Sequence, residues 1–208
     1  MFGDKILKNN KELYMTKNKS NIDIRRLTYL SVLTATVVVL QLVSSVVKFG
    51  MFSITFTLIP IVVGAAICGI GGGGWLGFVF GVVVLMLPET QASFSISIPG
   101  TVITVLLKGI LCGVVAGVVY KLLLKLNKTL SVYAAAIICP LVNTAVYILG
   151  SFIFFYDSLQ AQAAGVGQTV FYFVVVGIGL NALIEIIVSI VLAPTALLII
   201  NRADKNLQ

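Results

Sequence analysis

Residues 100–123 read GTVITVLLKGILCGVVAGVVYKLL, and only Lys108 and Lys121 in this stretch carry a charge. A helix needs about 20 predominantly apolar residues to cross the hydrocarbon core of a bilayer, which is roughly 30 Å thick. A membrane β-strand would instead show about ten residues of alternating polarity. Because backbone groups in lipid must be hydrogen-bonded within the segment, this continuous apolar run predicts a transmembrane helix.

Similar apolar runs extend along most of the 208-residue chain, which is 59% hydrophobic and 10% charged and has a mean hydropathy of +1.11. The pattern predicts an all-α integral membrane protein with six transmembrane helices. They are expected at residues 27–47, 53–69, 73–88, 100–123, 131–155 and 170–200. Because only a short turn from Ile70 to Gly74, which includes the first residues of the third span, connects the second to the third, these two should form a tight helical hairpin.

Basic residues predict the orientation of the chain in the membrane. With the amino terminus inside, 12 of the 14 Lys and Arg residues lie on the cytoplasmic side, and the exceptions are Lys48 and Lys108. By the positive-inside rule, both termini are expected to be cytoplasmic. We assign residues 1–26 to a basic cytoplasmic tail, 27–200 to a six-helix transmembrane domain and 201–208 to a short cytoplasmic tail. The net charge of +7 therefore indicates a topology and a lipid bilayer partner, not nucleic acid.

The sequence lacks the usual residues of catalytic and metal sites. It has no histidine, no phosphate-binding G-x-x-x-x-G-K-[ST] motif and no paired aspartates suited to magnesium. Its three cysteines are an odd number and lie inside apolar spans, which favours packing over disulfides or zinc. We therefore expect no enzyme, no metal and no cofactor.

Glycines recur at every fourth position in two of the predicted spans. This spacing lines one helix face with glycine, so that backbones can approach closely. Ordinary bundle packing is the favoured interpretation. The glycines are Gly69, Gly73, Gly77 and Gly81 in one series and Gly109, Gly113 and Gly117 in the other.

The outer loop between residues 89 and 100 contains strict alternation of serine with Phe or Ile from Ser93 to Ile98. Such alternation suits an extended segment with one face against apolar protein. A lid over a cavity or a plain connector would both show this pattern.

Polar residues inside the predicted spans are the candidates for substrate binding. Several of them lie about 12–18 Å below the outer surface at the rise of a helix, where an outward-open site would be. Thr104 shares a helix face with Lys108, and Gln91 lies in the neighbouring outer loop. The set is Lys108, Asn143, Tyr147, Asn181, Glu185, Gln91 and Thr104.

Two of these residues have a structural alternative. A buried ammonium needs a partner, so Lys108 either forms an ion pair with Glu185 or meets an anionic ligand. Asn143 follows Pro140, which should bend its helix as at a cavity wall. Asn143 could instead form a hydrogen bond that only holds two helices together.

Three stretches resemble the substrate-binding S components of energy-coupling factor (ECF) vitamin transporters. They are residues 25–35 (RRLTYLSVLTA), residues 59–81 from Ile59-Pro60 to the Gly74-Trp75 and Gly81 region, and Pro140-Leu-Val-Asn143-Thr144. The resemblance implies a small six-helix vitamin binder in the cell membrane. Such proteins associate with a transmembrane T component and two cytoplasmic ATPases. The overall pattern is most similar to the pantothenate branch, and riboflavin and folate binders share the scaffold.

The resemblance also implies a docking surface on the first helix. In the family two alanines four residues apart occupy this surface, and here Ser31 and Ala35 take their places. Three alternatives remain open: a gradient-driven transporter or channel acting alone, a membrane enzyme, and a membrane scaffold subunit. Internal inverted repeats or a chain of protonatable residues would favour the first, and we find neither.

Overall fold

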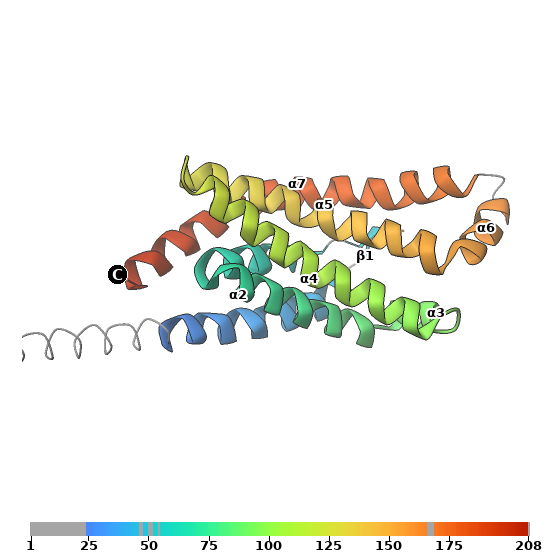
Figure 1. The fold of residues 1–208 in the computed structure, drawn as a ribbon, viewed down its shortest axis with the longest axis horizontal. Helices are drawn as coiled ribbons and strands as arrows, with labels where there is room; N and C mark the ends of the chain where they lie inside the picture. The colour runs from blue at the N-terminus through green and yellow to red at the C-terminus, as the bar shows by residue number, and fades with distance from the viewer. Residues whose placement is uncertain (1–23, 46–47, 50–51, 54, 166–168, 208) are drawn as a thin grey trace, which may run out of the picture.

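The computed structural model describes residues 24–45, 48–49, 52–53, 55–165 and 169–207. Long helices lying along one another make up the molecule (Figure 1). The first, Ile24–Ser45, is called the N-terminal helix below. The elements that follow are β1 (Lys48–Phe49), β2 (Phe52–Ser53), α2 (Leu58–Met86), α3 (Pro88–Phe94), α4 (Ile98–Leu123), α5 (Lys128–Phe154), α6 (Tyr156–Gly165) and α7 (Val170–Leu207). The two short strands pair antiparallel, with Lys48 opposite Ser53.

Five helices in the described residues are long and apolar enough to cross a membrane. They are Ile24–Ser45, Leu58–Met86, Ile98–Leu123, Lys128–Phe154 and Gly179–Asn206. The predicted class, an all-α integral membrane protein, is confirmed. The count of six spans and the cytoplasmic position of both ends stay predictions. The predicted amino-terminal tail lies almost entirely outside the described residues, and the chain after residue 200 continues α7 as a helix.

The helix α2 reverses direction at Gly69, whose φ of 79° and ψ of −173° are not helical. A Cβ placed on Gly73 would come 2.7 Å from the Cβ of Ala65. In a straight helix these positions would be about 12 Å apart along the axis. The tight hairpin is therefore confirmed, and its turn is the single residue Gly69. Its first arm, residues 58–68, is only about 16 Å long, roughly half the thickness of the hydrocarbon core.

The second arm of α2 packs against α4 through the two predicted glycine series. A Cβ on Gly77 would lie 2.0 Å from the carbonyl oxygen of Gly109, and one on Gly113 would lie 2.0 Å from that of Gly73. Only residues without a side chain allow this approach of two backbones. Gly69 does not belong to this contact, since nothing lies within 4 Å of its Cβ position.

The connection between α2 and α4 is helical, so the expected extended segment at residues 93–98 is wrong. Pro88 occupies the first turn of α3, where its missing N–H and fixed φ suit a helix start. The Ser97 side chain accepts a hydrogen bond of 3.2 Å from the backbone N–H of Gly100 and caps α4. These proline and cap signals determine the backbone here, and the alternation does not.

The core lies between α2, α4, α5 and the C-terminal part of α7, with one contribution from the N-terminal helix. Its fully buried side chains are small or branched. They include Val37, Ile61, Val62, Leu76, Cys112, Ala116, Val132, Ala135, Cys139, Ala196 and Ile200. The C-terminal part of α7 follows Pro194 and turns toward the N-terminal helix (Figure 1).

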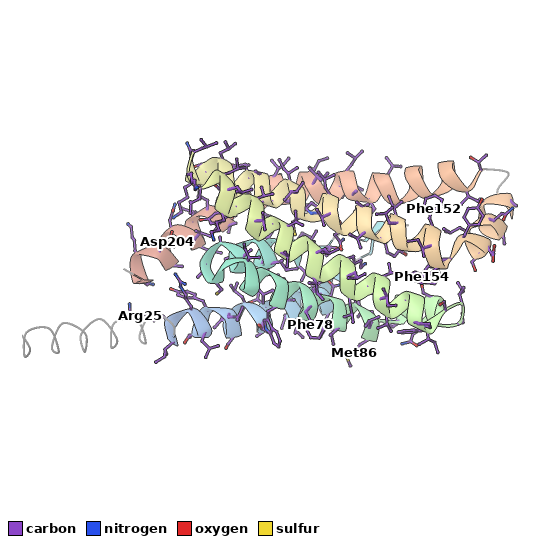
Figure 2. All side chains as sticks on the ribbon, viewed as in Figure 1. Arg25, Phe78, Met86, Phe152, Phe154 and Asp204 are labelled. Carbon is purple, nitrogen blue, oxygen red and sulfur yellow. The ribbon has the colours of Figure 1, made fainter. Side chains whose placement is uncertain are left out.

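Polar contacts hold that C-terminal part at one end of the bundle, where Figure 2 shows Arg25 and Asp204. The Nζ atom of Lys128 lies 2.5 Å from Oδ2 of Asp204. The Asn206 Nδ2 donates to the Tyr29 hydroxyl at 3.1 Å, and the Arg25 guanidinium donates to the Asn206 carbonyl. The end of α7 is therefore tied to the starts of α5 and of the N-terminal helix.

Candidate functional site

Antiparallel packing of α4 and α5 determines which residues meet across their interface (Figure 1). The thiols of Cys112 on α4 and Cys139 on α5 are in hydrogen-bonding contact. Two turns earlier on α4, Thr104 lies against Gly150 of α5, where an added Cβ would come 2.3 Å from the threonine methyl carbon. Lys108 lies between Thr104 and Cys112 on the same face of α4, because residues four apart share a face.

The helices α5 and α7 also run antiparallel and in contact (Figure 1). Cys139 on α5 is within electrostatic range of Glu185 on α7, so both lie in the same part of the bundle. Asn143 is one turn later on α5, and Asn181 is one turn earlier on α7. Because these helices are antiparallel, both steps lead in the same direction along the bundle. The step from Cys112 to Lys108 on α4 leads in that direction too.

We call Lys108, Asn143, Asn181 and Glu185 the polar cluster. Glu185 is 3% exposed and Asn143 is 7% exposed. The Asn181 Nδ2 donates to Oε1 of Glu185 across a long 3.4 Å, and the side chain of Thr55 also hydrogen-bonds to this carboxyl group. The positive charge of Lys108 acts on Glu185 as well. Ionisable side chains at this depth in a helix bundle need such compensation and commonly mark a functional site.

Aromatic rings surround the ammonium group of Lys108. Its Nζ lies 4.8 Å from the centroid of the Tyr147 ring and 5.9 Å from that of Phe80. The negative face of an aromatic ring attracts a cation at such distances, and more strongly where water is excluded. Phe80 is 2% exposed, whereas Tyr147 is 36% exposed. The rings of α2 and α5 therefore hold the ammonium between the core and the bundle surface.

Four buried polar atoms at this site have no hydrogen-bond partner among the described residues. Three belong to the polar cluster: Oδ1 of Asn143, Oδ1 of Asn181 and Oε2 of Glu185. The fourth is Oγ1 of Thr104, one turn from Lys108 on α4. Most buried polar atoms in folded proteins are paired. Only one other such unpaired atom, Oγ of Ser44, occurs among the described residues, so unpaired polar atoms are concentrated in this region.

The structure brings most of the predicted site residues together. Lys108, Asn143, Asn181 and Glu185 form the polar cluster, and Tyr147 packs on it. Thr104 lies at its edge, in the interface between α4 and α5. Gln91 is exposed on α3, and its substrate-binding role stays a prediction.

Two residues at the site were missed by sequence reasoning. Thr55 precedes α2 and reaches Glu185, although 130 residues separate them. Phe80 lies in the apolar run of α2 beside Lys108. A threonine at a span boundary and a phenylalanine within a span are too common to indicate a site, so no sequence signal could have found them.

The predicted docking residues lie on an exposed face of the N-terminal helix. Ser31 and Ala35 are both exposed, and the Ser31 hydroxyl donates to the carbonyl of Leu27 at 3.0 Å. That bond occupies the polar group of Ser31, so the residue presents a small and largely apolar surface. Larger exposed side chains flank the pair, with Leu27 at 63% and Val32 at 61% exposure.

The titratable residues described do not form a metal site, since no three His, Cys, Asp or Glu side chains come together among them. The cluster has instead one cation, one carboxylate and two amides. This set can hold a small polar molecule by hydrogen bonds and charge.

Comparison with known proteins gives one match. Residues 25–197 match the family described as "ECF transporter, substrate-specific component". No curated protein and no solved structure matches the chain. The matched segment contains all of the N-terminal helix after Ile24 and all four residues of the polar cluster. This is a family of transporter subunits, not of enzymes, and its members are multi-pass membrane proteins. The chain therefore belongs to the substrate-specific components of ECF transporters.

Proposed function

We propose that this protein is the substrate-capture subunit of an ATP-driven ECF importer and binds a vitamin or related small molecule from the outer face. The observation that carries the proposal is the polar cluster, a group of cation, carboxylate and amides within the matched segment, in which Glu185 and Asn143 are buried. A purely structural cluster would be expected to pair its polar atoms, and here three find no partner in the described part of the chain. Pantothenate is our first candidate ligand, and riboflavin and folate are the next.

The proposed partners are a T component and two cytoplasmic ATPases. Membership of the family supports this assembly. The exposed face at Ser31 and Ala35 is the proposed docking surface, since small residues let a partner helix approach closely. Energy for uptake would come from the ATPases, because this chain has no nucleotide-binding motif.

Uptake by cells tests the whole proposal. Cells that express this chain with the T component and both ATPases are expected to accumulate labelled pantothenate, riboflavin or folate. Cells that lack the ATPases should bind the label without accumulating it. Equal accumulation without ATPases would indicate a transporter acting alone, and neither binding nor uptake would indicate a scaffold subunit.

The docking surface is tested by Ala35→Trp. The bulky ring should abolish co-purification of the T component while ligand binding persists. Leu149→Trp is the matched control, because Leu149 is also on the helical surface, 62% exposed, but on α5. Normal recovery of the T component with Ala35→Trp would refute the docking assignment.

A further inference from the structure

Three buried oxygen atoms of the polar cluster have no hydrogen-bond donor among the described residues. They are Asn143 Oδ1, Asn181 Oδ1 and Glu185 Oε2, and all three act as acceptors. An amide oxygen and a carboxylate oxygen each need a donor when they are buried. A ligand that supplies only acceptors would leave all three atoms unpaired.

These acceptors come from α5 and α7, the helices beside Lys108 of α4. The Asn181 amide lies beside Glu185, and the charge of Lys108 acts on the same carboxyl group. The Lys108 ammonium itself lies against the rings of Tyr147 and Phe80.

Charge distinguishes the two ionisable side chains of the polar cluster. Lys108 is a cation and Glu185 is an acid. An anionic group beside Glu185 would meet a like charge in a medium of low dielectric constant. A hydroxyl or amine there would instead donate to Glu185 and to the asparagine oxygens. Any carboxylate of the ligand is accommodated better near Lys108.

We propose that the ligand carries a donor-bearing end, that at least two hydroxyl or amine protons of this end are bound by Glu185, Asn143 and Asn181, and that any anionic group of the ligand lies toward Lys108. This inference rests on the proposed function and adds the chemical class and orientation of the ligand. It selects molecules that combine a cluster of donors at one end with an acceptor or anionic group at the other. Molecules that are anionic at both ends are excluded.

Analogue pairs test the donor requirement on the full-length protein in lipid nanodiscs. Pantothenate is compared with its di-O-methyl ether, and riboflavin with lumiflavin, which lacks the hydroxylated side chain. One of the two parent compounds is expected to bind. Calorimetry should show that its analogue without hydroxyl donors binds with about 10- to 100-fold lower affinity. Equal binding of the parent and its analogue would overturn the proposal.

Variants test the acceptors. Glu185→Met and Asn143→Leu keep the approximate side-chain volume and remove the acceptor oxygens. Each substitution should lower the affinity for the parent compound about 10- to 100-fold. Ser131→Ala is the control, because Ser131 is buried at the other end of α5 and donates to the carbonyl of Asn127 at 2.8 Å. Thermal unfolding checks that each variant is folded, and an unchanged affinity in both acceptor variants would contradict the assignment.

Native mass spectrometry separates this inference from the proposed function. The protein is purified from cells grown in rich medium, and any bound small molecule is identified. A bound molecule without a pair of hydroxyl or amine donors overturns the inference and leaves substrate capture standing. A protein that is bare after purification, and stays bare with pantothenate, riboflavin and folate, overturns the capture function itself.

Discussion

The ammonium nitrogen of Lys108 lies 4.8 Å from the centroid of the Tyr147 ring. This contact joins α4 to α5 at the polar cluster. It helps to compensate the charge of a partly buried cation. The same side chain acts electrostatically on Glu185 of α7, so Lys108 connects three helices of the site.

The contact between Lys108 and Tyr147 should contribute about 0.5–2 kcal/mol to the free energy of unfolding. Tyr147→Leu removes the ring and should lower the free energy of unfolding by this amount. Tyr147→Phe keeps the ring and should lower it by less. A double-mutant cycle with Lys108→Met, measured by denaturant titration in mixed micelles, isolates the pair. A coupling energy near zero would show that the ring and the ammonium are only neighbours.

Replacement of Lys108 by Ala should also weaken ligand binding, because Lys108 is the one cation of the polar cluster. The protein should remain folded, since the side chain lies at the edge of the core and is only partly buried. Calorimetry with the ligand found by mass spectrometry measures the effect. Unchanged affinity would remove Lys108 from the site.

Gly77→Ala should destabilise the bundle by about 1–3 kcal/mol, because the new methyl group would lie 2.0 Å from the Gly109 carbonyl oxygen. The helices α2 and α4 would have to separate to relieve this contact. Gly71→Ala is the matched control: it lies in the same arm, nothing occupies the space within 4 Å of its Cβ position, and it should be neutral or slightly stabilising. Equal effects of the two substitutions on the free energy of unfolding would argue against the close helix contact.

Gly69→Ala should cost about 1–3 kcal/mol for a different reason. No atom lies near its Cβ position, but the φ of 79° with ψ of −173° belongs to a region that only glycine occupies readily. Gly69→Asn should destabilise the protein about as much as Gly69→Ala does. Asparagine tolerates the left-handed helical region of φ and ψ, but it does not tolerate the region that Gly69 occupies. Wild-type stability of both variants, measured by the same titration, would mean that the turn does not need this conformation.

The buried pair of Thr57 and Gln41 should contribute more to stability than the Lys128–Asp204 ion pair. The Thr57 hydroxyl donates to Gln41 Oε1 at 2.8 Å, and both side chains are buried. Thr57→Val leaves that oxygen unpaired and should cost about 1–3 kcal/mol, while Thr57→Ser should retain most of the stability.

Asp204→Asn removes an ion pair whose side chains are 31% and 41% exposed. It should cost less than about 1 kcal/mol, and the loss should shrink further at high salt. Asp157→Asn, at an exposed acidic residue of α6, is the control. An effect of Asp204→Asn larger than that of Thr57→Val would mean that the end of α7 is a cooperative part of the fold.

The sequence predicted features that depend on local periodicity. Apolar runs predicted the long helices, glycines at every fourth position predicted helix faces on which backbones approach closely, and polar residues within the spans predicted most residues of the candidate site. The missed helix α3 shows the limit of such patterns. Six residues of alternation suited a strand, but Pro88 and the Ser97 cap determine the backbone there.

By itself, therefore, the sequence determined the membrane class, the long apolar helices and the faces on which Lys108, Asn143 and Glu185 lie. Only the tertiary structure decided that these faces turn toward one region of the bundle, that Phe80 and Tyr147 hold the ammonium, and that Thr55 reaches the carboxyl group. The physical reason is that spacing within a helix follows from its 3.6-residue turn, which each segment carries alone. The register between helices depends on close packing of all the side chains and glycines at their interfaces, which involves residues far apart in the chain.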